Sequence, residues 1–362
     1  MSALKYLALR KSFFFIPIGF VLFILYLYFY VGFSEISNIL SKIDSVQYFA
    51  FYSLAIVSIL LGILFWAMSW KNVLDSLSIR LSLKSAFLYY WVGYFVDLVV
   101  PCETVCGEVT RLYLVHKETD KNVGEIAAGG IANRIVAYLI VVAGLYMSVV
   151  LLVLRGSEIP DLVTNLLILI LAGATIYLAA LLYLAFSKYA AKRLASVGIK
   201  LLRILGPKKY SSKELSDKVE ASLSAFYSGF KLFREKPRLL LKPFIFLSLS
   251  FLLYLFAYVL VFFALGIYSQ PFAFFIVIYF VGGSVQDAAA GFSVGTLEII
   301  LSTLFILYGL NPALSGITAA LVRSVTFWFP LILGYIVVQV VGARKLLAPK
   351  TGLATDPPKL TK

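Results

Sequence analysis

The sequence contains six uninterrupted apolar runs that are each long enough to cross a lipid bilayer. They lie at about residues 12–33, 47–69, 126–154, 162–187, 241–266 and 313–342. A membrane-spanning helix needs roughly 20 mostly apolar residues, and the composition agrees, because 61% of the 362 residues are hydrophobic and only 14% are charged. We therefore expect an all-α, polytopic membrane protein in the cell membrane.

Two further apolar regions are interrupted by polar residues and glycines. Residues 83–115 contain "PCETVCGEVTR" at 101–111, and residues 271–310 contain "GGSVQDAAAGFSVG" at 282–295. Irregular backbone at membrane depth leaves amide and carbonyl groups unpaired, so it survives only where protein or a water-filled cavity covers it. Each interrupted region is therefore predicted to be a re-entrant hairpin made of a broken helix.

The breaks are expected at proline and glycine residues, which interrupt helices most effectively. In the first hairpin these are Pro101 and Gly107, and in the second they are Gly291 and Gly295. Asp287, in the second break, is a candidate helix cap and a candidate gating or proton-coupling residue.

The distribution of lysine and arginine supports this topology. If both interrupted regions return to the side they came from, 28 of the 32 basic residues fall on the same side as both termini, and only Lys42 and Arg155 fall on the other. Cytoplasmic loops carry such an excess of positive charge. We therefore predict six crossing helices and two re-entrant hairpins with both termini cytoplasmic. The formal net charge of +14 then needs no nucleic-acid partner to explain it.

The same topology predicts an inverted repeat. Glu108 precedes Arg134 by 26 residues, and Glu298 precedes Arg323 by 25 residues. Each glutamate follows a glycine-bearing break, and each arginine lies in the next crossing. The two arginine-bearing crossings are separated by two others, so they run in opposite directions. Broken helices at corresponding positions of inverted repeats are typical of secondary transporters.

The charged residues of these repeats are candidates for a substrate site. An ionisable side chain at the bilayer centre costs at least about 2.5–3.5 kcal/mol, so it normally faces a cavity or a partner. The planar guanidinium group suits phosphate, so we expect Arg134 and Arg323 to bind an anionic headgroup, with Arg111 assisting at the cytoplasmic mouth. Glu108 and Glu298 are predicted gating counter-charges or proton carriers. No metal or other cofactor is expected.

Two simpler interpretations of these residues stay open at this point. Glu108 and Arg111 are three residues apart, the spacing of an ordinary ion pair on a helix surface. Arg134 lies only some eight residues into its apolar run, so its long side chain could reach the cytoplasmic surface.

A basic segment at residues 188–240 separates the two halves of the predicted single transporter-like domain, residues 1–345. It contains "KYAAKRLASVGIKLLRILG" and "VEASLSAFYSGFKLFREKP", in which apolar residues recur at helical spacing between lysines and arginines. This pattern predicts amphipathic helices on the cytoplasmic leaflet. The polar, proline-bearing tail at 346–362 is predicted to be disordered.

Three short motifs resemble those of a known family. "PCETVCGEVTR" at 101–111, "GFSVGTLE" at 291–298 and "RSVTFWFPLILG" at 323–334 are similar to the signatures of flippase-like integral membrane proteins typified by the lysylphosphatidylglycerol synthase transmembrane region. The resemblance covers about residues 10–345. It departs in two places: Asn133 stands where the family often has an acid before the arginine, and residues 286–291 lack the proline that is common in the glycine-rich break.

The resemblance implies movement of lipids or lipid-linked precursors between leaflets. Together with the predicted repeat it favours a flippase for an anionic phospholipid or a polyprenyl-phosphate lipid, working by alternating access. Two other hypotheses stay open: a membrane-embedded transferase acting on a lipid-linked sugar or phosphate, and a non-catalytic partner of envelope or glycan assembly.

Overall fold

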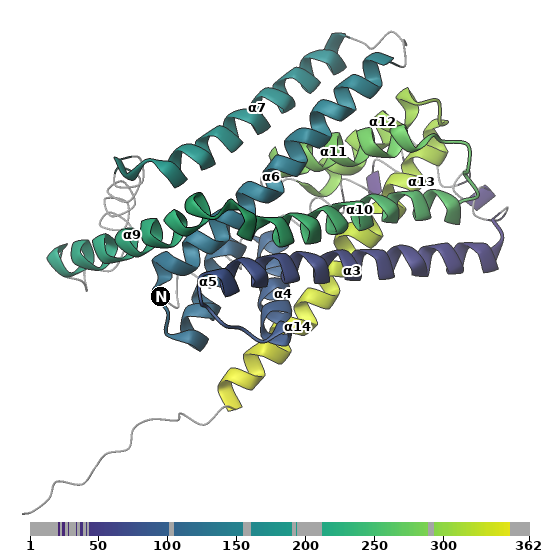
Figure 1. Cartoon of the computed structure of the whole chain (residues 1–362). Coiled ribbons are helices and arrows are strands. Elements are labelled where there is room, and N and C mark those ends of the chain that lie inside the picture. The colour runs from purple at the N-terminus through teal and green to yellow at the C-terminus, as the bar shows by residue number, and fades with distance from the viewer. Residues whose placement is uncertain are drawn as a thin grey trace, which may run out of the picture.

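The computed structural model describes residues 43–100, 105–154, 161–189, 212–288 and 293–347, with isolated positions between 21 and 41 and at 193. Within these residues the regular structure is helical and contains no strand. The elements are α3 (Ser45–Ser76), α4 (Leu83–Val99), α5 (Val105–Thr119), α6 (Val123–Leu154), α7 (Asp161–Phe186), α9 (Ser212–Glu235), η2 (Pro237–Leu240), α10 (Leu241–Ala264), α11 (Phe272–Ala288), α12 (Ser293–Leu307), α13 (Pro312–Arg323), η3 (Ser324–Trp328) and α14 (Phe329–Leu347). Figure 1 shows their arrangement.

Five helical segments in the described part of the chain are long and apolar enough to cross a membrane. They are Ser45–Ser76, Val123–Leu154, Leu167–Phe186, Pro237–Ala264 and Pro312–Gly342. They coincide with five of the six apolar runs in the sequence, which confirms an all-helical, multi-pass membrane protein. The remaining run, at about 12–33, falls largely outside the described residues.

Each interrupted region folds as two short helices that pack against each other. The first consists of α4 and α5, with 17 and 15 residues, and the second of α11 and α12, again with 17 and 15 residues. At 1.5 Å per residue these helices are about 22–26 Å long, shorter than the hydrocarbon core of roughly 30 Å. The predicted breaks are therefore present, while the re-entrant course through the membrane stays a prediction.

The residues predicted to make the breaks lie at helix starts or outside the described chain. Gly107 falls in the first turn of α5, and Gly295 falls in the first turn of α12 with φ of 84°, a conformation that glycine adopts readily. Pro101 and Gly291 lie outside the described residues. Asp287 is the penultimate residue of α11, so the expectation that it caps the following helix, which begins at Ser293, is wrong.

The topology predicts how single cysteines label from the two sides of the membrane. Arg80 precedes α4 and Lys117 lies in the last turn of α5, while Ser269 and Asn311 flank the α11–α12 pair. If both pairs are re-entrant, cysteines at 80 and 117 will react with an impermeant maleimide from one side, and cysteines at 269 and 311 from the other. Right-side-out and inverted vesicles measure this directly.

The labelling requires a background in which Cys102 and Cys106 are replaced by serine. This background protein, without added cysteines, should take up no label. Opposite labelling of positions 80 and 117 would show that α4 and α5 together cross the membrane, and the same result at 269 and 311 would show a crossing there.

Among the described helices, α3 and α10 make the most extensive contact with each other, and they lie side by side in Figure 1. The Ser58 hydroxyl donates to the carbonyl of Leu253 at 2.8 Å, and the Ser250 hydroxyl donates to the carbonyl of Gly62 at 2.7 Å. A Cβ at Gly62 would lie only 2.9 Å from the ring of Tyr254. Small residues and buried hydroxyls therefore join these helices, as they commonly do where lipid provides no hydrophobic driving force between helices.

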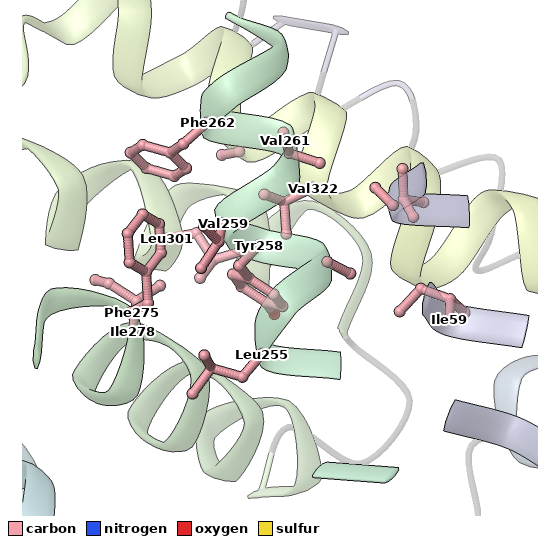
Figure 2. Close-up of a cluster of buried hydrophobic side chains, with 14 of the residues drawn as sticks. Ile59, Leu255, Tyr258, Val259, Val261, Phe262, Phe275, Ile278, Leu301 and Val322 are labelled. Atoms are coloured by element: carbon pink, nitrogen blue, oxygen red, sulfur yellow. The ribbon is translucent and has the colours of Figure 1, made fainter. Parts of the chain in front are cut away.

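A large apolar cluster connects this pair to the second half of the chain. Side chains of α10 belong to one buried cluster with Ile59 of α3, Leu301 of α12 and Val322 of α13, which are labelled in Figure 2. The ring of Phe262 is edge-to-face with those of Phe274, Phe275 and Phe305, with a centroid distance of 5.1 Å to Phe275, a favoured geometry for aromatic pairs. The cluster fixes α12 and α13 relative to α3 and α10.

The helix that carries Arg323 changes its hydrogen-bond pattern immediately after that residue. Residues Ser324–Trp328 form a π-helical segment, in which the amide of Phe329 donates to the carbonyl of Ser324. Pro330 has no amide hydrogen to donate to the carbonyl four residues earlier. The proline therefore accounts for the wider turn, and such π segments often occur at functional sites.

One part of the basic segment packs against the rest of the chain. The second amphipathic sequence is helical, as expected, and forms α9. However, Phe230 and Phe233 are buried against Leu178 of α7 and residues of α6. Gly124 permits the close approach of α6 to α9, because a Cβ there would overlap the carbonyl of Ser222. The chain itself therefore covers this part of the apolar face, and the position of α9 on the cytoplasmic leaflet stays a prediction. Residues 194–211, in the first amphipathic sequence, and 348–362, in the tail, lie outside the described residues.

Candidate functional site

A cavity of about 280 Å³ lies between α3, α4, α5, α6, α10 and α11. Its charged and polar lining residues are Asp97, Glu108, Arg111, Asn133, Arg134, Ser284 and Thr326. Its aromatic lining residues are Trp66, Trp70, Tyr90, Tyr94, Tyr138, Phe251, Tyr254, Tyr258, Tyr279 and Phe280. The helices thus place four charged side chains in a cavity whose lining is rich in aromatic rings.

Arg111 is the centre of an ion-pair cluster on one side of this cavity. Its Nη2 donates to Asp97 Oδ2 at 3.0 Å, and its Nη1 donates to Glu108 Oε2 at 2.7 Å. The guanidinium carbon also lies 4.5 Å from the centroid of the Tyr90 ring, a cation–π geometry. The Arg111 side chain is only 7% exposed, so its pair with Glu108 is not an ordinary exposed pair on a helix surface.

Sequence reasoning did not select Asp97 as a site residue. Its carboxylate accepts from Arg111 with one oxygen and from the backbone amide of Gly107 with the other, at 2.7 Å. A Cβ at Gly107 would overlap both the Asp97 carboxylate and the carbonyl oxygen of Gly93. The signal was present in the sequence, because Asp97 is an acid inside an apolar run, the same criterion that identified the other candidates.

Replacing Gly107 with alanine is expected to lower the free energy of unfolding by about 1–3 kcal/mol, the usual cost of overpacking. The added methyl group would meet backbone of α4 as well as a side chain, so small rotations cannot relieve it. Thermal unfolding in detergent measures the loss. The matched control is Gly173→Ala, because nothing lies within 4 Å of a Cβ there. Equal stability of the two variants would contradict the close packing of α4 and α5.

Arg134 lies on α6 and lines the same cavity. Its Nη1 donates to the hydroxyl of Tyr177 at 3.4 Å, and Glu108 lines the same cavity. The space that Glu108 needs is provided by Gly130, where a Cβ would overlap Glu108 Oε1. Asn133, which replaces the acid common in the similar family, lines the cavity and accepts from the Ser69 hydroxyl at 2.6 Å.

The charged residues of the second half form a separate, closed ion pair. Arg323 Nε donates to Glu298 Oε1 at 3.1 Å, and the side chains are 1% and 0% exposed. The other oxygen of Glu298 accepts from the amide of Gly295 at 2.7 Å. The Arg323 guanidinium carbon lies 4.4 Å from the centroid of the Phe327 ring. Neither Glu298 nor Arg323 is among the residues that line the cavity.

The structure therefore brings the five predicted charged residues into two groups rather than around one chamber. Glu108, Arg111 and Arg134 share the cavity with Asp97, whereas Glu298 pairs with Arg323 elsewhere. The two groups use the same bonding pattern. In each, one carboxylate accepts from the amide of a break glycine with one oxygen and from an arginine with the other.

The charged and aromatic side chains of this cavity have the chemistry to bind a polar, charged group. Guanidinium groups provide charged donors that suit phosphate, and a low-dielectric aromatic surround strengthens such contacts. Among the residues described, no group of three or more histidine, cysteine, aspartate or glutamate side chains is placed to hold a metal ion.

Similarity to known proteins extends over most of the chain. The chain is 26% identical to the UPF0104 membrane protein PH1989 of Pyrococcus horikoshii over 93% of its own length and 98% of the relative's. It is 24% identical to the UPF0104 membrane protein MJ1595 of Methanocaldococcus jannaschii over 88% of its own length and 92% of the relative's. No solved structure matches the chain. The model of the lysylphosphatidylglycerol synthase TM region matches residues 16–334, and the chain therefore belongs to that family of multi-pass membrane proteins.

Proposed function

We propose that this protein is a flippase of the cell membrane that moves an anionic phospholipid or a polyprenyl-phosphate lipid between leaflets. The observation that carries the proposal is the cavity enclosed by membrane helices and lined by Arg111 and Arg134. A charged headgroup in this cavity would be surrounded by polar side chains, whereas among the acyl chains it would have no polar partner. The family assignment, to a transmembrane region named after a lipid synthase, supports a lipid as the substrate.

The lining suggests a role for each charged residue. Arg134 binds the phosphate, and Arg111 assists at the cytoplasmic mouth. Glu108 is a counter-charge: it holds the empty site neutral through its ion pair with Arg111 and is released, or carries a proton, when a headgroup enters. Asp97 holds Arg111 in position through the second ion pair and ties it to the start of α5.

The second half supports alternating access. Glu298 and Arg323 occupy the positions that correspond to Glu108 and Arg134 in the repeat, with nearly the same spacing, yet they are fully buried. We infer that they are the closed counterpart of the open site. In the opposite state the first site would close and Arg323 would become available to the phosphate. The π segment that follows Arg323 gives this helix a place to change its hydrogen-bond register.

Reconstituted protein tests the function. Vesicles that contain the protein and a trace of fluorescent polyprenyl phosphate or fluorescent anionic phospholipid are treated with a membrane-impermeant quencher. We expect the protein to raise the fraction of label that the quencher reaches, from about half toward all, within minutes. Protein-free vesicles should stay near half. Failure to accelerate the exchange of either lipid, in vesicles shown to contain folded protein, would contradict a flippase.

A further inference from the structure

The unpaired polar atoms of the cavity-lining residues indicate which chemical groups a ligand of the cavity should carry. Four side chains that line it each have a buried polar atom without a hydrogen-bond partner among the described residues: Trp70 Nε1, Glu108 Oε1, Arg111 Nε and Ser284 Oγ. Buried polar groups in proteins are nearly always paired, and an unpaired one costs free energy. These atoms are covered in this structure, with Arg111 Nε packed beside Gly93 and Glu108 Oε1 beside Gly130. A ligand would reach them only when their side chains turn toward the cavity, and pairing them would then favour binding.

The four atoms require a ligand that both donates and accepts hydrogen bonds. The indole and guanidinium nitrogens are donors only, the ionised carboxylate oxygen is an acceptor only, and the serine hydroxyl is either. A phosphodiester offers acceptors alone, so it leaves Glu108 Oε1 unpaired. Hydroxyl groups offer both kinds of partner.

The charges of the lining residues also favour a ligand that both donates and accepts hydrogen bonds. Two cations, Arg111 and Arg134, share the cavity with two carboxylates, Asp97 and Glu108. A phosphate alone makes no favourable direct contact with the carboxylates, because like charges repel. A headgroup that combines a phosphate with hydroxyl groups uses both, since its phosphate contacts the arginines and its hydroxyls donate to the carboxylates.

The aromatic wall suits a ring with an apolar face and a polar rim. Six tyrosines line the cavity, namely Tyr90, Tyr94, Tyr138, Tyr254, Tyr258 and Tyr279. Each combines a flat apolar ring with a hydroxyl that donates and accepts. A sugar or cyclic polyol presents C–H groups to such rings and hydroxyls at its edge. The volume of about 280 Å³ is at the lower end for small-molecule sites, and fits a headgroup with one ring.

From these observations we propose that the transported lipid carries a sugar or polyol attached to its phosphate. This rests on the proposed function and names the substrate class of the same site. The shared chemistry is a phosphodiester joined to a hydroxyl-rich ring, whether the lipid tail is a polyprenyl chain or a pair of acyl chains.

Binding to the purified full-length protein in detergent tests the proposal with two matched pairs of lipids. One pair is polyprenyl phosphate and polyprenyl hexosyl phosphate, and the other is phosphatidic acid and phosphatidylinositol. Titration followed by native mass spectrometry gives the four affinities. We expect the ring-bearing member to bind at least about tenfold more tightly than its bare partner in one pair or both, and the pair that responds identifies the tail.

Variants connect this preference to the unpaired atoms. Trp70→Phe and Ser284→Ala should each lower the affinity for the ring-bearing lipid by about two- to tenfold, the worth of one hydrogen bond. Ser315→Ala is the matched control, because Ser315 Oγ is also buried without a partner in the described structure but lies outside the cavity lining. It should leave the preference unchanged.

The outcomes separate this inference from the function on which it rests. Equal or tighter binding of the bare phosphate lipids, together with flipping of those lipids, would overturn the hydroxyl-rich headgroup and leave the flippase standing. Binding of a ring-bearing lipid without any lipid movement in vesicles would contradict the flippase and keep the ligand class.

Discussion

Arg323→Met is expected to destabilise the protein by about 3–5 kcal/mol, the usual cost of removing one partner of a buried ion pair. The substitution leaves the carboxylate of Glu298 at 0% exposure without its cation. Glu298 would still accept from the amide of Gly295, but one hydrogen bond does not compensate a buried charge. The measurement is thermal or denaturant-induced unfolding in detergent, compared with wild type.

A second substitution distinguishes loss of a charge partner from loss of packing. In the double variant Arg323→Met with Glu298→Gln, the amide oxygen still accepts from Gly295 and no charge is buried, so most of the lost stability should return. The matched control is Lys231→Ala, which removes a cation from the exposed pair with Glu235 and should cost less than about 1 kcal/mol. Equal stability of Arg323→Met and wild type would show that the pair does not hold α12 to α13.

The double variant also tests the role of the second half in transport. If Arg323 takes over the phosphate in the opposite state, the stable double variant should flip lipid far more slowly than wild type. Wild-type rates in that variant would remove Arg323 from the mechanism and leave the pair a structural one.

Arg134→Ala is expected to slow lipid movement by about 10- to 100-fold. A hydrogen bond to a charged group contributes about 1.5–3 kcal/mol, and each 1.36 kcal/mol is a factor of ten in rate. Arg134 lines the cavity, and its loss would leave the phosphate without its principal cation. The quencher assay in vesicles measures the rate.

Two further variants test whether the effect is specific to the guanidinium group of Arg134. Arg134→Lys should retain part of the activity, because an ammonium keeps the charge but lacks the planar fork of donors. Arg238→Ala removes an exposed arginine outside the cavity and should flip lipid at the wild-type rate. An Arg134→Ala protein as fast as Arg238→Ala would exclude Arg134 from phosphate binding.

The membrane helices were largely predictable from the sequence. Five apolar runs became five candidate spans, because the need for about 20 apolar residues is a property of each segment alone. The two broken regions were also found, since the polar and glycine-rich stretches of the chain interrupt an apolar pattern locally. The position of Asp287 was mistaken for a cap because helix ends depend on packing as much as on local sequence.

The candidate site was predictable only in part. Acids and arginines in apolar sequence identified Glu108, Arg111 and Arg134, and the same rule would have identified Asp97. The apolar pattern of α9 likewise predicted a helix, but not that α6 and α7 cover part of its apolar face.

The sequence by itself determined which segments are apolar helices, where two of them break, and which charged residues lie within apolar sequence. Each of these follows from the transfer of a short segment or single side chain out of water, which needs no knowledge of its neighbours. Only the tertiary structure decided that Arg134 shares a cavity with Arg111 while Arg323 is sealed against Glu298. That grouping depends on how closely Gly93, Gly107 and Gly130 let the consecutive helices α4, α5 and α6 approach one another, and on contacts of a few ångströms that no local pattern records.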